Sequence, residues 1–240
     1  MAIGLVGSEM CIRDSPNMSR MDWAVELFQW FNYYLKDIGD EPEPMVQIQT
    51  NDGRWHVEDT WPPEDTTWNL ADIGTDWSVT GDTVNGQGAS VTLVSGELTE
   101  LTHISGLPTL HLEVTTQACQ GGQIFATLYD NEDNLRLGHA TMDVRYRDGG
   151  YDAKATSPFS SYTMLMEFNP LDVVVPAGHT LRIELTENGE DYLPSPCASN
   201  PLGGLTVDGG VVGLPIIDRP KSHDSWFLAP PWWEQQPIPE

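Results

Sequence analysis

One histidine stands where this sequence could carry chemistry, in the segment PAGHTLRIELTE at 176–187. His179 follows a glycine at the start of an alternating apolar run, and a histidine in such a turn can act as a general base or a metal ligand. A base needs a nucleophile or an acid partner, and a metal needs further ligands. The adjacent sequence offers neither, so we expect His179 to be a residue at the start of a β-strand.

Metal ligands are sparse elsewhere in the sequence. The other five histidines, none of which forms an H-x-x-x-H pair or a Cys/His cluster, are His56, His103, His111, His139 and His223. His111 and Glu113 share a predicted strand face, but two groups do not make a zinc site. The segment DNEDN at 130–134 has oxygens that suit calcium, yet it lacks the glycine and distal glutamate of an EF-hand. We therefore interpret it as a polar hairpin turn and expect no metal and no cofactor.

The sequence also lacks the motifs that position a nucleophile or a phosphate. It has no G-x-S-x-G, no G-x-x-x-x-G-K-[ST] and no G-x-G-x-x-G segment. A nucleophile elbow needs small residues around its serine, and a phosphate loop needs glycines and a lysine before a helix. We accordingly assign no catalytic residue and no cofactor-binding residue to this chain.

Charge restricts the partners. The 240 residues include 36 acidic and 11 basic side chains, for a formal net charge of −25. Such a surface repels nucleic acid and anionic membranes. It fits either an ordinary self-repelling soluble surface or a salty environment that screens the repulsion. No run of 18 apolar residues is present, so we expect no membrane span.

Three cysteines bear on the redox compartment. Cys119 and Cys197 lie in loop-like sequence, and spacing leaves open whether they form a disulfide or remain two free thiols. A disulfide would suit an oxidising compartment, so a secreted or cell-surface location is favoured over a cytoplasmic one. Cys11 belongs to residues 1–15, which have no basic region or A-x-A site and resemble translated sequencing adapter. We interpret that segment as a non-native leader on a C-terminal fragment.

The elements that must position these residues begin with a helix. Apolar residues recur at helical spacing over 18–37, with Ser19 as N-cap and Gly39 and Pro42 as stop signals. A single helix cannot bury so aromatic a face, which requires a large partner surface. The residues that we assign to a domain interface are Trp23, Leu27, Trp30, Phe31 and Tyr34.

Strands dominate the remainder. MVQIQT and RWHVED read as a hairpin around NDG, and residues 66–88 read as an irregular loop crossing. From residue 90 onward, eight to ten short apolar-alternating segments alternate with turns, which is typical of a β-sandwich. The long crossings favour a Greek-key jelly roll. The expected fold class is therefore mainly β, a jelly-roll sandwich (galactose-binding-like) preceded by one amphipathic aromatic helix.

These elements predict a domain order. After the leader come the helix at 16–40, a connecting hairpin at 41–65 and the sandwich at 66–219. The tail at 220–240 is rich in Pro and Trp and should run extended, either along the body of the protein or on a partner. Two tryptophans, Trp55 and Trp61, offer planar rings for stacking on a glycan, although packing is the preferred interpretation.

Several segments together resemble one family. LFQWFNYYLKD followed by PMVQIQTNDGRWHVEDTWPP resembles the seam between domains of the X-Pro dipeptidyl-peptidase and cocaine-esterase-like serine hydrolases. ISGLPTLHLEVTT, FATLYDNEDN, LGHATMDVRYRD, VVVPAGHTLRIELT and GGVVGLPII resemble successive strands of that family's C-terminal jelly roll. The match covers about residues 24–217. Asp37 stands where the family often has glycine, which would leave Gly39 as the helix stop.

The resemblance implies a function for a longer protein. In that family an α/β-hydrolase domain carries a Ser-Asp-His triad upstream of the aromatic helix, and nothing in this sequence corresponds to those residues. The chain would then be a jelly roll that packs on the missing catalytic domain of the same polypeptide, shapes substrate access and is inactive alone. The alternative is a stand-alone carbohydrate-binding or adhesion module. Oligomeric state and the substrate of the parent enzyme stay open.

Overall fold

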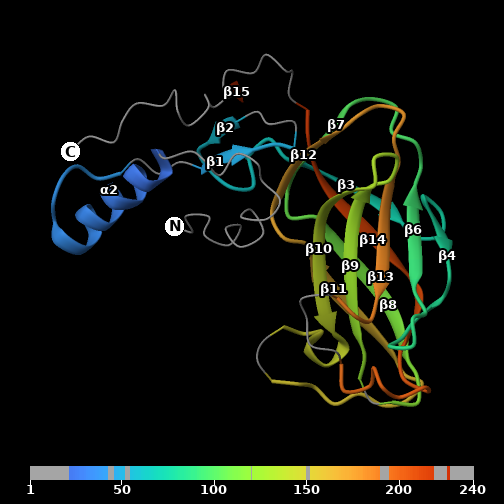
Figure 1. Ribbon diagram of the computed structural model, residues 1–240. Helices are drawn as coiled ribbons and strands as arrows, with labels where there is room; N and C mark the ends of the chain where they lie inside the picture. Colours follow the sequence, from blue (N-terminus) through green and yellow to red (C-terminus); the bar gives the residue numbers. More distant parts are fainter. Residues whose placement is uncertain are drawn as a thin grey trace. The chain divides into compact units, whose positions relative to one another are not determined.

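The computed structural model describes residues 22–42, 46–51, 55–119, 121–149, 152–189, 195–218 and 226–227. The chain divides into two compact units (Figure 1). One unit comprises residues 65–218, and the other comprises residues 1–64 together with 219–240.

The unit at 65–218 is a sandwich of two antiparallel sheets, as Figure 1 shows. The first sheet has the strand order β10 (Leu135–Asp143), β9 (Gln123–Asp130), β13 (Leu181–Thr186), β6 (Val91–Ser95) and β4 (Trp77–Thr80). The second has the order β11 (Ser161–Glu167), β8 (Thr109–Thr116), β14 (Leu205–Ile217), β7 (Thr102–Gly106) and β12 (Leu171–Val175), with β3 (Thr67–Asp72) and β5 (Thr83–Val84) also paired to β14. The predicted β-sandwich is confirmed.

Alternation in the sequence sets which side chains enter the core. In β13 the residues Leu181, Ile183 and Leu185 are fully buried, whereas Arg182 and Glu184 lie on the opposite face and form an ion pair at 3.2 Å. β8 repeats the pattern, with its leucines and Val114 buried and His111 and Glu113 exposed. Both predicted face assignments are confirmed, because a period of two residues is the geometry of a strand.

The core lies between the two sheets. Its largest side chains come from both sheets and are almost inaccessible to solvent, and they are Trp77, Leu93, Ile104, Leu110, Leu112, Ile124, Leu128, Met164, Met166, Phe168, Leu181 and Ile183. Burial of an aliphatic or aromatic side chain contributes about 1.5–3 kcal/mol. A core of this size is therefore a major source of the stability of the sandwich.

The prediction of an irregular crossing at 66–88 is wrong. Three strands, β3, β4 and β5, lie in this region and pair with β14 and β6. The local signal for β3 is short, since only Trp68 and Leu70 alternate with polar residues, and the structure leaves both exposed, at 51% and 68% accessible. Their strand conformation comes from pairing with distant segments rather than from local propensity.

The predicted helix is present as α2 (Asp22–Lys36), but its stop is not Gly39. The backbone of Asp37 already adopts the left-handed conformation, with φ of 55°, and its N–H donates to Tyr33 O at 3.1 Å. This is the αL type of helix C-cap, a position that favours glycine and tolerates Asp. Ser19, the expected N-cap, lies outside the described residues.

The unit that contains α2 also has three short strands. β1 (Val46–Gln49) pairs antiparallel with β2 (Trp55–Glu58), as the predicted hairpin requires, and β15 (Trp226–Phe227) pairs with β2 on its other side. Part of the Pro/Trp-rich tail is thus extended as a strand. Among the described residues, no helix has the length and apolar character needed to cross a membrane.

Candidate functional site

His179 lies at the end of a turn, and an acid partner contacts it. Gly178 adopts a φ of 87°, and its N–H donates to Leu98 O at 2.8 Å, which fixes the turn before β13. The Nδ1 atom of His179 lies 2.9 and 3.0 Å from the two carboxylate oxygens of Asp130 and donates to them. The expectation that His179 has no acid partner is therefore wrong. Its partner is 49 residues away, at the end of β9.

The DNEDN turn supplies a second carboxylate to the same place. Glu132 accepts hydrogen bonds from Thr180 N at 2.6 Å and from Thr180 Oγ1 at 2.9 Å. Potential ligand atoms of Asp130, Glu132 and His179 all lie within 4.8 Å of one another. The segment is a hairpin turn between β9 and β10, as predicted, but it is also joined to the turn that carries His179.

Charge at this junction favours the protonated imidazole. The hydrogen bond to Asp130 raises the pKa of His179, with burial opposing that effect and the charges of Asp130, Asp133 and Glu132 adding to it. The hydrogen bond from the Thr180 backbone lowers the pKa of Glu132. The first shift is what an acid-rich turn facing one histidine should produce, and the second follows from a hydrogen bond that stabilises the carboxylate.

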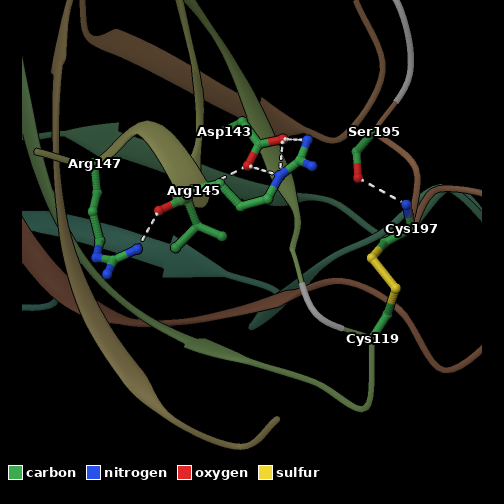
Figure 2. A network of polar contacts seen from close by, with 7 residues as sticks. Cys119, Asp143, Arg145, Arg147, Ser195 and Cys197 are labelled. Atoms are coloured by element: carbon green, nitrogen blue, oxygen red, sulfur yellow. Dashed lines mark hydrogen bonds and ion pairs between the residues drawn. A yellow bond between two sulfur atoms is a disulfide. The ribbon is translucent and has the colours of Figure 1, made fainter. Parts of the chain in front are cut away.

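Another end of the sandwich holds a disulfide and an ion pair (Figure 2). Of the two arrangements that spacing leaves open, the structure has the Cys119–Cys197 disulfide. Ser195 Oγ accepts from Cys197 N at 3.0 Å, which orders the segment on one side of the bridge. Nearby, Arg145 Nη2 lies 2.6 Å from Asp143 Oδ2. This pair caps the short 3-10 helix at Val144–Tyr146, because Asp143 also accepts from Arg145 N.

A buried carboxyl group lies close to this disulfide end. Glu187, at the end of the PAGHTLRIELTE segment, is 1% accessible, and neither carboxyl oxygen makes a well-formed hydrogen bond to a described residue. Burial raises the pKa of Glu187, and the charge of Asp143 adds to that effect. Contacts of the carboxyl group with Ser195 and with the Gly86 backbone oppose this rise. The sequence gives no sign of this group, since Glu187 follows an ordinary alternating strand.

The residue types of a catalytic triad meet at a third position, but in a non-catalytic order. His103 Nε2 lies 2.6 Å from Asp172 Oδ1, and Ser105 Oγ donates to Asp172 Oδ2 at 2.8 Å. In a triad the serine bonds to the histidine, whereas here both bond to the carboxylate. All three side chains are buried, so substrate has no access to the serine. We interpret the group as a structural link between β7 and β12.

The remaining predicted residues lie in the helix and the hairpin. Leu27 and Trp30 are half-buried, whereas Phe31 and Tyr34 are exposed; of Trp23 only the helical backbone is described. Trp61 is half-buried, and the side chain of Trp55 lies outside the described residues. The glycan-stacking role of Trp55 and Trp61 therefore stays a prediction.

Together, these features define an accessory β-sandwich, with core, cross-links and buried polar pairs but no accessible nucleophile–base pair among the residues described. The model of a known family, the X-Pro dipeptidyl-peptidase C-terminal non-catalytic domain, matches residues 39–202. That range is more than half of the 240 residues. The chain belongs to the X-Pro dipeptidyl-peptidase C-terminal non-catalytic domain family.

Relatives agree with this assignment. A putative Xaa-Pro dipeptidyl-peptidase of Bacillus anthracis is 24% identical over 229 residues, which cover 83% of this chain and 38% of that protein. A CocE/NonD family hydrolase from Staphylococcus aureus has a TM-score of 0.58 at 13% identity, covering 82% of this chain and 46% of its own. An aminopeptidase from a marine sediment archaeon, Thaumarchaeota archaeon, has a TM-score of 0.59 at 15% identity, covering 80% and 44%. The chain thus spans less than half the length of each.

Proposed function

We propose that this chain is the C-terminal β-sandwich of an X-Pro dipeptidyl-peptidase-like serine hydrolase, where it packs on an α/β-hydrolase domain and shapes substrate access. The parent would cleave peptide or ester bonds through an acyl-enzyme. One observation carries the proposal, namely the match of residues 39–202 to a domain family described as non-catalytic. The chemistry then belongs to a part of the polypeptide outside this chain.

Helix α2 supports the packing part of the proposal. It exposes apolar side chains that a helix would ordinarily cover, including Phe28 at 66% and Leu35 at 71% accessible. Trp30 lies against Tyr34 with tilted rings, at 4.9 Å between ring centroids. Exposed aromatic and aliphatic side chains gathered on one helix are typical of an interface.

The coding sequence upstream of residue 16 provides the first test. We expect an α/β-hydrolase domain with a G-x-S-x-G segment, and its absence would contradict the proposal. The full-length protein should then hydrolyse Ala-Pro-p-nitroanilide. In that protein, replacing Phe28 and Phe31 by serine should lower activity, whereas Gln29→Ala on the same helix should not. Equal activity in the unmodified protein, the double serine variant and the Gln29→Ala variant would count against a role for α2 in domain packing.

A role in substrate access has its own readout. If the sandwich flanks the active-site entrance, substitutions of its surface residues in the full-length protein should alter KM for long peptides more than KM for a dipeptide nitroanilide. A kcat change of equal size for both substrates would instead indicate loss of the catalytic geometry.

A further inference from the structure

The junction of the 130–134 turn and the 176–180 turn brings two carboxylates of one turn together with an imidazole of the other. Asp130 ends β9, Glu132 follows in the hairpin turn, and His179 precedes β13. Their ligand atoms lie within 4.8 Å of one another, and Asp130 and His179 are already in contact at 2.9 Å. A histidine nitrogen brought from a segment 49 residues away distinguishes this group from a patch of surface acids.

Charge at the junction is unbalanced. Three carboxylates, those of Asp130, Glu132 and Asp133, face the single imidazole of His179. The guanidinium of Arg182 lies beside the same turn, but its Nη atoms donate to the amide oxygens of Asn131 at 3.1 Å and Asn134 at 2.6 Å.

Arg182 is further engaged by Glu184, at 3.2 Å, and by the ring of Tyr129, at 4.5 Å from its centroid. It therefore does not neutralise these carboxylates, and a bound cation would.

The positions of the three side chains suit binding from solvent. Asp130 is 2% accessible and is fixed by its contact with His179, so it offers a preformed anchor. His179 is half-buried and Glu132 is exposed, which leaves an open side for an ion and its water ligands. Thr180 holds Glu132 through two hydrogen bonds, so the flexible member of the set is already oriented.

We propose that Asp130, Glu132 and His179 form a binding site for a divalent transition-metal ion of the Zn²⁺ type, which clamps the 130–134 turn to the 176–180 turn. One imidazole and two carboxylates match the nitrogen and oxygen ligands of Zn²⁺. Ca²⁺ and Mg²⁺ take oxygen ligands and gain nothing from the imidazole. On binding, the proton on Nδ1 is released to solvent while Nε2 keeps its own proton, so that the lone pair of Nδ1 faces the ion.

The test uses the whole 240-residue chain after tag removal and EDTA treatment. A Cys11→Ser background prevents the third cysteine from binding zinc. Titration calorimetry with ZnCl₂ should show saturable binding of one ion per chain. At a free Zn²⁺ concentration about a hundred times the Kd, the melting temperature should rise by about 5–10 °C. Ca²⁺ and Mg²⁺ at the same concentration should produce no comparable rise.

Matched variants separate this site from general zinc binding. His179→Gln and Glu132→Gln should each weaken binding at least about tenfold. His111→Gln serves as the control, because His111 is an exposed histidine beside Glu113 on β8 and should leave the affinity unchanged. If His179→Gln does not fold, the exposed Glu132→Gln variant and the NMR shift of the His179 ring on zinc addition still decide the outcome.

Three results would overturn the proposal. They are absence of saturable zinc binding, binding that both site variants retain, and stabilisation by Ca²⁺ equal to that by Zn²⁺. The last would show that the imidazole is not a ligand.

Discussion

The Cys119–Cys197 disulfide should contribute a large part of the stability of the sandwich. It joins residues 78 positions apart, both within the unit at 65–218. In the chain-entropy model, closing a loop of that length removes unfolded-state entropy worth about 4.5 kcal/mol at 25 °C. For a domain of this size, each kcal/mol corresponds to about 2–4 °C in melting temperature. Replacing both cysteines by alanine should therefore lower Tm by about 9–18 °C.

Urea unfolding followed by tryptophan fluorescence measures the effect, since Trp77 is buried in the core. The oxidised chain should have the higher midpoint and the smaller slope, because the disulfide keeps the unfolded chain more compact and less surface is exposed on unfolding. Cys11→Ser is the control for loss of a cysteine outside the bridge. A loss of stability below about 1 kcal/mol in the double variant would refute the entropic reasoning.

Three further substitutions test buried features of the sandwich. Because burial raises the pKa of Glu187, its stabilising neutral form is complete below the ordinary glutamate pKa and is lost as pH rises through the raised value. Glu187→Gln should therefore exceed the parent in stability at pH 7 and match it near pH 4 by chemical denaturation; a constant difference would contradict this. Asp172→Ala leaves His103 and Ser105 without a shared acceptor and should cost about 3–5 kcal/mol in urea unfolding, and a neutral effect would show that the group is dispensable. Gly210→Ala places a Cβ 2.0 Å from His111 O and should lower stability by about 3 kcal/mol, whereas Gly96→Ala, with open space around it and an ordinary backbone conformation, should not; equal melting temperatures would contradict the assigned register.

Local patterns in the sequence predict the parts of the fold that depend on local physics. Alternation in Leu181–Thr186 gives both the strand and its buried face, and helical spacing gives α2. The strand Thr67–Asp72 has only a short alternation of this kind, and its conformation depends on pairing with β14 more than a hundred residues away. The sequence predicts the end of the helix at Gly39, which is too late, because Asp37 adopts the left-handed conformation that glycine usually takes.

The site could be predicted only in pieces. Local sequence gives His179 no partner and gives the DNEDN turn no EF-hand pattern, yet each supplies ligand atoms that the other lacks. Their contact depends on β9 and β13 being neighbours in one sheet, with Leu181 opposite Asp130. Strand order is a property of the whole chain, so residue spacing carries no information about it. The buried Glu187 escaped notice for the same reason.

The central claim is that this chain is a non-catalytic domain that docks on a catalytic domain through α2. The most direct test is to express the upstream portion of the same gene separately and titrate this chain into it by calorimetry. We expect saturable one-to-one binding that Phe28→Ser with Phe31→Ser weakens at least about tenfold, as loss of aromatic anchors should. Absence of binding, or hydrolysis of Ala-Pro-p-nitroanilide by this chain alone, would contradict the account.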